Sequence, residues 1–223
     1  MDFSLIETLR WEPDKGFVHL ALHMARLEAS AKALGFHGAE NAEAALNGCV
    51  ENEIRSGLIS PQGRKLTETQ TSHRVRLELV ADGTITVTSS PLIVQSENTI
   101  WTVKIASTRL SSEDKLLHHK TSRRSVYDLA RAEFSKDDAD EVLLLNERGE
   151  LCEGTITSVF VQDDSGMFLT PPLNSGLLAG VLRSSLLQSG KAREQKLTPG
   201  DLDGRLVYVG NSLRGLISAR LKS

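Results

Sequence analysis

The chain has 223 residues, of which 39% are hydrophobic, 25% charged and 4% aromatic, a composition typical of one or two globular domains. Lys and Arg total 26 and Asp and Glu total 29, so the formal net charge of -3 argues against a dedicated nucleic-acid binder. The sequence has neither a run of about 18 apolar residues, which a membrane-spanning helix requires, nor the pattern of a secretory signal. Cys49 and Cys152 form no CxxC pair, and we expect a cytoplasmic protein without a disulfide framework or a metal site.

The first part of the chain predicts two strands followed by a helix. One short strand is expected over Phe3–Trp11, which is rich in β-forming residues, and a second over Gly16–Leu20. Across residues 20–34 apolar side chains recur at spacings of three and four, which predicts a helix. We expect that helix to end at Gly35.

The next segments predict a second helix and a hairpin. The helix is expected over Asn41–Ile54, with the asparagine at its start as the N-cap. The stretch Ser56–Lys65 has the Gly, Ser and Pro content of a loop. Residues 73–92 predict a hairpin because polar and apolar residues alternate on both sides of an Asp82-Gly83 turn. A further strand is expected over Thr99–Ala106.

From Ser107 to Asp114 the sequence turns polar, which is typical of a linker. We therefore expect a small α+β domain over residues 1–106, an interdomain linker over 107–117 and a larger domain over 118–223. The elements expected in the larger domain are a helix over Ser122–Phe134, two strands around a turn at Glu147–Gly149, a strand ending near Thr170, a helix over Val181–Gln188, a strand over 206–210 and a terminal helix near Leu213.

The segment LLHHKTSRR places Lys120 among cations, with His118 and His119 before it and Arg123 and Arg124 after it. Neighbouring cations disfavour a protonated ammonium, so this lysine would be partly neutral near pH 7 and nucleophilic towards a carbonyl. The alternative is a solvated basic patch at the start of a helix. This segment alone leaves both interpretations open.

Glu153 lies in GELCEGTITSVFV between two apolar strands, and the Gly154 that follows it lets a ligand or a backbone segment approach closely. A half-buried carboxylate in that place would bind a protonated ring nitrogen. The alternative is a solvent-exposed glutamate at the end of a turn, and the residues themselves favour neither.

Two predicted loop-to-helix junctions, one at Gly180–Arg183 and one at Gly210–Arg214, would present free backbone N–H groups. At the second junction Asn211 and Ser212 would add capping side chains. The N-terminus of a helix attracts phosphate through its dipole and its N–H groups. Ordinary helix capping is the simpler explanation of either junction when it is taken alone.

His23, Arg26 and Ser30 fall on one face of the first predicted helix. A guanidinium held there would pair bidentately with a phosphate, or would form a salt bridge on a solvated face. A nucleophilic lysine, an acid for a ring nitrogen and several phosphate-binding segments together describe a pyridoxal phosphate site.

The chain resembles the fold-type IV pyridoxal-phosphate enzymes, the class IV aminotransferase family. That family includes branched-chain and D-amino-acid aminotransferases and 4-amino-4-deoxychorismate lyase. The resemblance rests on EGTITSVF, FLTPPLNSGLLAGVLR and VGNSLRGL, in the family's order and spacing, and on IETLRW and HMARLEASAKALGF in the N-terminal half. It implies a two-domain α+β fold of the D-amino-acid aminotransferase type, pyridoxal 5'-phosphate in the interdomain cleft, and a homodimer.

Residue by residue, the resemblance implies that Lys120 is the Schiff-base lysine and proton shuttle and that Glu153 pairs with the pyridine nitrogen. Arg26 would bind the cofactor phosphate, and Tyr127 would contact the ring hydroxyl. The rest of the phosphate site would be the backbone at Val181 and Leu182 together with Asn211 and Ser212.

Three features depart from the family pattern. Ser158 replaces the usual Asn of EGxxTN, Leu182 stands where many family aminotransferases have Thr, and the chain begins almost at the IETLRW segment. These departures imply a trimmed site or an unusual substrate.

Within the family, IETLRW, HKTSRRSVY and GNSLRG look most like the lyase domains sometimes fused behind aminodeoxychorismate synthase. The resemblance then implies that Lys120 removes a Cα proton and that pyruvate leaves, which forms 4-aminobenzoate, a folate precursor. Planar guanidinium groups suit the substrate carboxylates, and the candidates are Arg74, Arg76 and Arg214. The alternatives are an amino-acid aminotransferase of the branched-chain or D-amino-acid type, a cofactor-binding homologue without turnover, and a non-catalytic binding module.

Overall fold

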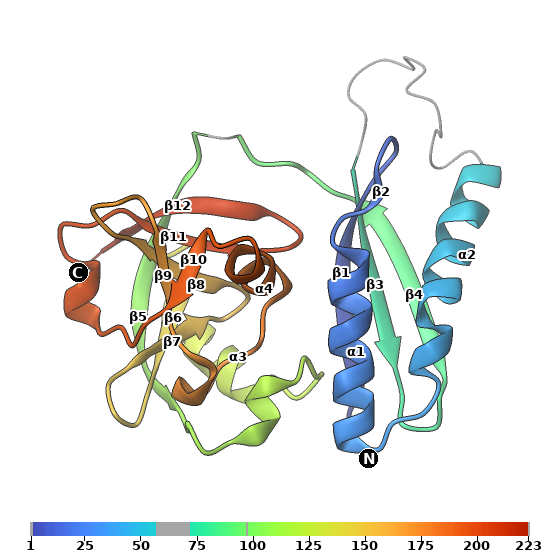
Figure 1. Cartoon of the computed structure of the whole chain (residues 1–223), viewed down its shortest axis with the longest axis horizontal. Helices are drawn as coiled ribbons and strands as arrows, with labels where there is room; N and C mark the ends of the chain where they lie inside the picture. The colour runs from blue at the N-terminus through green and yellow to red at the C-terminus, as the bar shows by residue number, and fades with distance from the viewer. Residues whose placement is uncertain (1, 57–71, 97, 223) are drawn as a thin grey trace. The chain divides into compact units, whose positions relative to one another are not determined.

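The computed structural model describes residues 2–56, 72–96 and 98–222, and its helices and strands are shown in Figure 1. The chain divides into two compact units. Unit 1 contains residues 1–94 and 120–123, and unit 2 contains residues 95–119 and 124–223. The loop predicted over Ser56–Lys65 lies outside the described residues from residue 57 onward.

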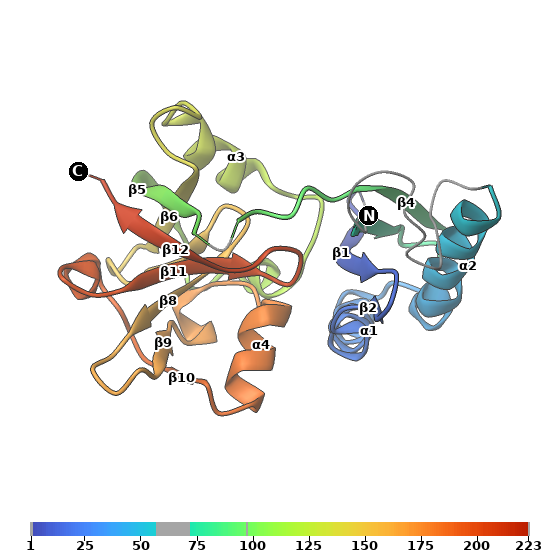
Figure 2. The ribbon, with the colours of Figure 1, turned by 90° about the horizontal axis from the view of Figure 1, so that it is seen from above.

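Unit 1 is a four-stranded antiparallel sheet with two helices on one of its faces (Figure 2). The strand order is β2-β1-β3-β4. The elements of unit 1 are β1 (Leu5–Glu12), β2 (Gly16–Phe17), α1 (Leu20–Leu34), α2 (Ala42–Arg55), β3 (His73–Leu79) and β4 (Ile85–Pro91). The two predicted helices and the predicted hairpin of this unit are thereby confirmed.

Alternation along the strands separates the two faces of the unit 1 sheet. In β3 every second side chain is buried, so Val75 and Leu77 join the core beneath α1 and α2 while Arg74 and Arg76 face the other way. The end of α1 is also as predicted. Gly35 takes a left-handed conformation with φ 72°, and its N–H donates to a carbonyl of the last turn.

Unit 2 contains an eight-stranded mixed sheet in the order β10-β9-β8-β11-β12-β5-β6-β7. Its central strands contribute apolar side chains to one core cluster, and α3 packs against β5 and β6 through Tyr127 and Ala130. The elements of unit 2 are β5 (Ile100–Leu110), α3 (Ser125–Ala132), β6 (Glu141–Asn146), β7 (Leu151–Gly154), β8 (Ser158–Gln162), β9 (Phe168–Thr170), α4 (Val181–Gln188), β10 (Ala192–Glu194), β11 (Val207–Asn211) and β12 (Gly215–Leu221).

The terminal helix predicted near Leu213 is wrong, because the chain from Gly215 to Leu221 is strand β12. This strand is hydrogen-bonded to β11 on one side and to β5 on the other. Leu, Ala and Arg in this segment are good helix formers, but strand partners on both sides override that local preference. The Gly210–Arg214 junction is therefore a hairpin turn and not the start of a helix.

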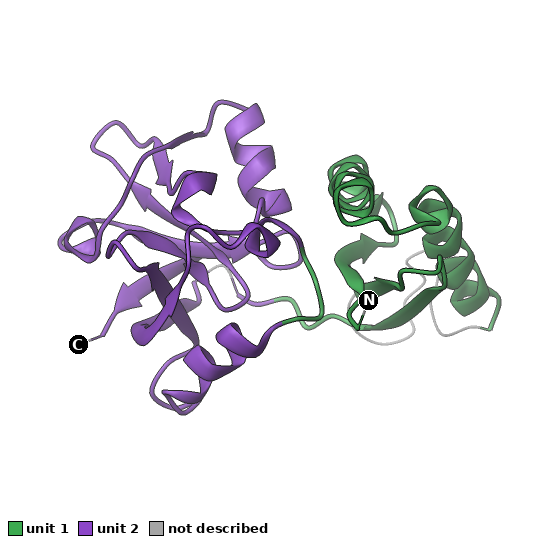
Figure 3. Cartoon of the chain, turned by 90° about the horizontal axis from the view of Figure 1, so that it is seen from below, with its two compact units in different colours: residues 1–94, 120–123 green, residues 95–119, 124–223 purple. Residues whose placement is uncertain are grey.

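The division into units differs from the expected boundary at residue 106 (Figure 3). Strand β5 continues to Leu110 and pairs with β6 and β12 of unit 2. The polar residues Ser107 and Thr108 lie at an irregularity in its pairing with β6, where the Glu133 carboxylate accepts hydrogen bonds from both of their N–H groups. The polar composition from Ser107 onward thus marks an irregularity within β5, which continues to Leu110 where the linker was expected to begin.

Two kinds of feature are absent from the part of the chain that the structure describes. Within residues 2–56, 72–96 and 98–222, no helix has both the length and the apolar character needed to cross a membrane. In these same ranges, no group of three or more His, Cys, Asp or Glu side chains is arranged to hold a metal ion.

Candidate active site

Lys120 belongs to a short extended segment that is hydrogen-bonded to the edge of β1 in unit 1. The N–H of Ile6 donates to the carbonyl of Lys120 at 2.8 Å, and the next residue, Thr121, forms an antiparallel bridge with Leu5. Helix α3 begins only at Ser125, so Lys120 does not lie at the helix start that the basic-patch interpretation assumed. Its backbone is instead fixed beside β1.

A buried charge cluster lies between β1 and α1. Glu7 is 1% exposed, and its carboxylate accepts hydrogen bonds from Arg26 Nε at 2.8 Å and from Arg26 Nη2 at 2.6 Å. The Nδ1 atom of His23 lies 2.6 Å from the Oε2 atom of the same carboxylate. His23 and Arg26 thus share one face of α1, as their spacing predicts, but that face is buried and is not the solvated face of the alternative interpretation.

Opposing effects set the charges in this cluster. Burial acts to raise the pKa of Glu7, but the charge of Arg26 and the hydrogen bonds from His23 and Arg26 outweigh burial and bring this pKa to about 2. Burial lowers the pKa of His23 despite the opposing effect of Glu7. At neutral pH the imidazole is therefore uncharged and donates from Nδ1, while its buried Nε2 has no hydrogen-bond partner among the described residues. Glu7 thus holds the Arg26 guanidinium in one orientation by an ion pair.

In unit 2, Glu153 lies on β7 and is 5% exposed. The Tyr127 hydroxyl donates to its Oε1 atom at 2.7 Å, and the N–H of Leu178 donates to the same oxygen at 3.2 Å. Burial and the charge of Glu153 raise the pKa of Tyr127 far above its ordinary value, so the hydroxyl remains a donor. Glu153 is therefore buried and not a solvent-exposed turn residue, and Tyr127 has this carboxylate as a partner.

Glu141, at the start of β6, is a second buried carboxylate of unit 2, and the sequence-based prediction missed it. It accepts hydrogen bonds from N–H and hydroxyl groups of Val142, Thr155, Ile156 and Thr157. The signal in the sequence is an acidic residue at the first position of the apolar strand EVLLL. An acid that is buried in this way requires several donors to replace water.

Two glycines allow the start of α4 to lie against strands β8 and β11. A Cβ atom at Gly180 would lie 2.5 Å from Ser158 Oγ, and a Cβ atom at Gly210 would lie 2.9 Å from Leu182 Cδ2. Gly210 and Ser158 are also direct partners in the β11–β8 pair. Since Gly180 has no side chain, the first turn of α4 carries no side-chain cap, and its N–H groups form a donor set that suits a phosphate.

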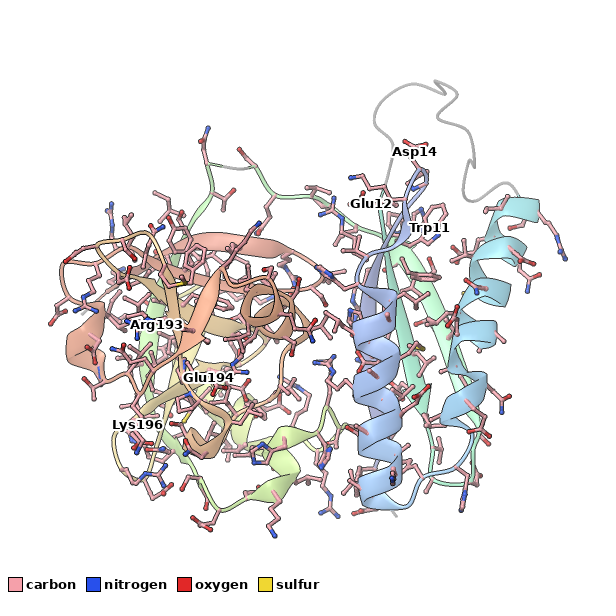
Figure 4. All side chains as sticks on the ribbon, viewed as in Figure 1. Trp11, Glu12, Asp14, Arg193, Glu194 and Lys196 are labelled. Carbon is pink, nitrogen blue, oxygen red and sulfur yellow. The ribbon has the colours of Figure 1, made fainter. Side chains whose placement is uncertain are left out.

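Arg183 anchors this first turn of α4. The residue is 2% exposed, and its guanidinium donates to the Pro171 carbonyl from Nε at 3.3 Å and from Nη2 at 2.8 Å. The same guanidinium is paired with Glu194 of β10, which is labelled in Figure 4. Arg183 is therefore committed to the protein, and the candidate phosphate donors at this turn are the backbone groups of Val181 and Leu182.

Asn211 closes the turn between β11 and β12. Its Oδ1 atom accepts the N–H groups of Leu213 at 3.1 Å and of Arg214 at 3.0 Å, and its Nδ2 atom donates to the Ile156 carbonyl at 3.1 Å. These contacts correct the prediction of a helix N-terminus with free N–H groups at this place. Ser212 is half-buried within the same turn. The residue before the turn, Gly210, lies next to the Leu182 side chain at the start of α4.

The three candidate arginines for substrate lie in different surroundings. Arg74 and Arg76 share the face of the unit 1 sheet that is opposite its helices. The Arg76 guanidinium donates to Glu78 Oε1 from Nε at 2.9 Å and from Nη2 at 2.6 Å. Arg214 is exposed in unit 2, with its guanidinium carbon 5.9 Å from the centre of the Trp101 ring.

The predicted site residues therefore form two groups. Unit 1 contains Lys120, Arg26 and the two arginines of β3, and unit 2 contains the other predicted site residues. Within unit 2 the structure brings Tyr127 to Glu153, and it brings the start of α4 to the β11–β12 turn. Glu7 is a further residue that sequence reasoning missed. Its signal is an acidic side chain at a core-facing position of β1.

Comparison with known proteins identifies the family of this chain. The family model "Amino-transferase class IV" matches residues 4–221. A Schizosaccharomyces pombe protein named "Putative aminodeoxychorismate lyase" is 31% identical over 204 residues, which cover 87% of this chain and 80% of that protein. The crystal structure of a "Putative amino-acid aminotransferase" from Mesorhizobium loti is 42% identical with a TM-score of 0.87 and covers 99% of this chain and 100% of its own.

A more distant match concerns the fold alone. The pyridoxal-phosphate-bound form of a hypothetical aminotransferase from Mycobacterium tuberculosis has a TM-score of 0.79 at 16% identity, over 98% of this chain and 81% of its own. The predicted two-domain α+β fold is confirmed by these likenesses. The chain belongs to the class IV aminotransferase family, whose members are pyridoxal-phosphate-dependent enzymes.

Proposed function

We propose that this enzyme binds pyridoxal phosphate and acts as an aminodeoxychorismate lyase that releases pyruvate and forms 4-aminobenzoate. The observation that carries the cofactor assignment is the buried Glu153 carboxylate, to which Tyr127 donates at 2.7 Å. A carboxylate held in this way suits a protonated ring nitrogen. The bound cofactor would supply an electron sink for the negative charge that develops when a substrate loses its Cα proton.

The residues present fit the remaining parts of the cofactor. A phosphate requires N–H donors and a cation, which the uncapped start of α4 and the Arg26 guanidinium would supply. The aldehyde requires a primary amine, which is the role of Lys120. The residues proposed for the cofactor belong to both units of the chain.

Each side chain then has a defined task. Lys120 would hold the cofactor through its Nζ atom and, when released, would move the proton at the substrate Cα. Glu153 would keep the proton on the ring nitrogen. Arg74 is the first choice for a substrate carboxylate, because the Arg76 guanidinium is occupied by Glu78 whereas Arg74 makes no ion pair among the described residues.

Amino-acid transamination is the second candidate function. The observation that favours it is the Mesorhizobium loti relative, which is named as an amino-acid aminotransferase and is 42% identical over nearly the whole chain. Both reactions begin with loss of the Cα proton and differ in their later steps. The same side chains would therefore serve either reaction.

The first test concerns the cofactor and its lysine. The full-length protein, reconstituted with pyridoxal phosphate, is expected to show a yellow absorbance band and, after borohydride reduction, a pyridoxyl group on Lys120 in peptide mass spectra. Lys120→Ala should lose the adduct, and Lys115→Arg, which keeps a cation at a nearby position, should retain it. A colourless wild-type protein would overturn the cofactor assignment, and an adduct on another lysine would overturn the site.

The second test separates the reactions. A lyase is expected to release pyruvate and 4-aminobenzoate in equal amounts from 4-amino-4-deoxychorismate without a keto acid. An aminotransferase would instead require a keto acid and would convert it to the matching amino acid. A protein that binds the cofactor and does neither is a homologue without turnover. Sedimentation of the same sample tests the homodimer that the family resemblance implies.

A further inference from the structure

We propose that Glu141 is a positioning residue of the cofactor site, which shapes the loop 154–157 and so places Glu153 at one end of that loop and Ser158 at the other. The inference rests on the proposed binding of pyridoxal phosphate. Glu141 itself touches neither the proposed cofactor nor the substrate in this scheme. Its effect passes through the backbone that wraps its carboxylate.

Both carboxylate oxygens of Glu141 are held by this loop. Oε1 accepts hydrogen bonds from the Val142 N–H at 2.8 Å, from the Thr155 N–H at 3.1 Å and from the Thr155 hydroxyl at 2.6 Å. Oε2 accepts from the Ile156 N–H at 3.1 Å and from the Thr157 hydroxyl at 2.8 Å. Consecutive residues of the loop thus turn their donors towards one carboxylate.

A buried carboxylate such as that of Glu141 requires these hydrogen-bond donors in place of water. The residue is 1% exposed and forms no ion pair with the described residues, so only neutral donors replace its water. The loop donors are equally dependent on the carboxylate, because buried N–H and hydroxyl groups are unfavourable without an acceptor. The carboxylate and the loop therefore hold each other in one conformation.

Gly154 shows how closely the backbone wraps the carboxylate. A Cβ atom at this position would lie 2.8 Å from Glu141 Oε2 and would also collide with the Thr157 hydroxyl oxygen. The N–H of Gly154 donates to the Thr157 carbonyl at 2.7 Å, which closes the turn around the acid. A glycine is thus required directly after Glu153 because the Glu141 carboxylate fills the space of a side chain.

The loop 154–157 connects Glu141 to the residues proposed for the cofactor. Glu153 is the residue immediately before it, and Ser158, immediately after it, lies against Gly180 at the start of α4. In the middle of the loop, the Ile156 carbonyl accepts a hydrogen bond from Nδ2 of Asn211, the residue that closes the β11–β12 turn. One buried carboxylate is therefore linked to the group proposed for the ring nitrogen, to the start of α4 and to the β11–β12 turn.

The test compares Glu141→Gln with Glu133→Gln in the full-length protein. Glu133 is a matched control because it also accepts two backbone N–H groups and one hydroxyl, but from Ser107 and Thr108 of β5. Pyridoxal phosphate is titrated into each apoprotein, and absorbance gives its Kd. Glu141→Gln is expected to weaken binding by about 10-fold or more, and Glu133→Gln by less than about 2-fold.

A second readout follows the loop without the cofactor. In amide NMR spectra of the apoprotein, Glu141→Gln should shift the Thr155 and Ile156 signals, which report hydrogen bonds to a charged acceptor. Thr157→Val removes one donor, keeps the β-branched shape, and keeps the inference testable should the Gln variant fail to fold. Its control is Thr198→Val, which removes a hydroxyl bonded to Asp201 at 2.9 Å. Thr157→Val is expected to weaken pyridoxal phosphate binding by about 3-fold.

The outcomes separate the two proposals. A wild-type protein that binds pyridoxal phosphate, together with folded Glu141 and Thr157 variants whose Kd values equal those of their controls, overturns the role of Glu141 alone. A wild-type protein with no affinity for pyridoxal phosphate overturns the proposed function and the role together. Selective weakening in both variants, with the amide shifts confined to the loop, supports the role.

Discussion

Glu7 in unit 1 and Glu141 in unit 2 are equally buried, at 1% exposure each, but their carboxylates are stabilised in opposite ways. Glu7 accepts two hydrogen bonds from the Arg26 guanidinium and one from His23. Glu141 accepts only from backbone N–H groups and threonine hydroxyls. The same side chain is thus neutralised by a cation in one unit and solvated by a loop in the other.

The difference shows what each kind of partner achieves. An ion pair between Glu7 and Arg26 fixes the direction of one long side chain, which is the group proposed for the phosphate. Donors from successive backbone positions instead fix the course of a loop, as around Glu141. Orienting a charge and shaping a backbone are therefore separate tasks, and each unit uses a buried glutamate for one of them.

The largest effect is expected when the ion pair is broken. Glu7→Gln leaves the nearly buried Arg26 guanidinium without its carboxylate and should lower the free energy of unfolding by about 3–5 kcal/mol. Glu141→Gln, which leaves only neutral donors facing an amide, should cost about 1–3 kcal/mol. Urea denaturation of both variants measures the difference, with the exposed Glu51→Gln as control. Equal losses at Glu7 and Glu141 would contradict the distinction between the two carboxylates.

Low pH should reduce the free energy of unfolding through the ion pair between Glu7 and Arg26. The folded-state pKa of Glu7, about 2, lies below the ordinary value of 4.5, so its stabilising contribution is complete above pH 4.5 and is lost as the pH falls through 2. That contribution corresponds to about 3 kcal/mol. The lowered pKa of His23 acts in the same direction below pH 6.5, because the unfolded chain takes up a proton that the buried imidazole resists.

The measurement is the difference in unfolding free energy between the wild type and Glu7→Gln across this pH range. The difference should be constant at neutral pH, should shrink below pH 4.5 and should nearly vanish near pH 2. Other carboxylates titrate in both proteins and cancel in the subtraction. A difference that does not change with pH would show that Glu7 is not an ionised partner of Arg26.

Sequence reasoning selects candidate residues whose type suggests chemistry. Lys120 among cations, Glu153 before a glycine, and Arg26 on a helix face are candidates by residue type and spacing, and the family resemblance supplies their expected roles. Glu7 and Glu141 escaped because a lone glutamate in an apolar strand becomes informative only when its partners are known. Those partners come from the packing of α1 on β1 and from the 154–157 loop beside β6, and neither is visible in a local pattern.

The errors in the predicted fold have the same origin, namely contacts that a local pattern does not show. The segment Gly215–Leu221 contains Leu, Ala and Arg, which favour a helix, but it is a strand because β5 and β11 offer partners on both of its edges. The polar residues of β5 suggested a linker, although they lie where the strand bulges and Glu133 accepts their N–H groups. Contacts between residues distant in the sequence decided both cases, whereas α1 and the β3–β4 hairpin followed local periodicity and turn residues.

The smallest of these effects is expected at the hydrogen bond between Tyr127 and Glu153. Tyr127→Phe removes the hydroxyl that donates at 2.7 Å and should lower the free energy of unfolding by about 1–2 kcal/mol. The matched control is Tyr208→Phe, since Tyr208 is the other tyrosine of the chain and its ring packs edge-on against Phe168. Urea denaturation and titration with pyridoxal phosphate should both separate the two variants, because only Tyr127 acts on the carboxylate proposed for the ring nitrogen. Loss of stability without loss of cofactor affinity would show that the Tyr127–Glu153 hydrogen bond stabilises the fold without contributing to cofactor binding. The loop around Glu141 would then be the remaining candidate for positioning Glu153.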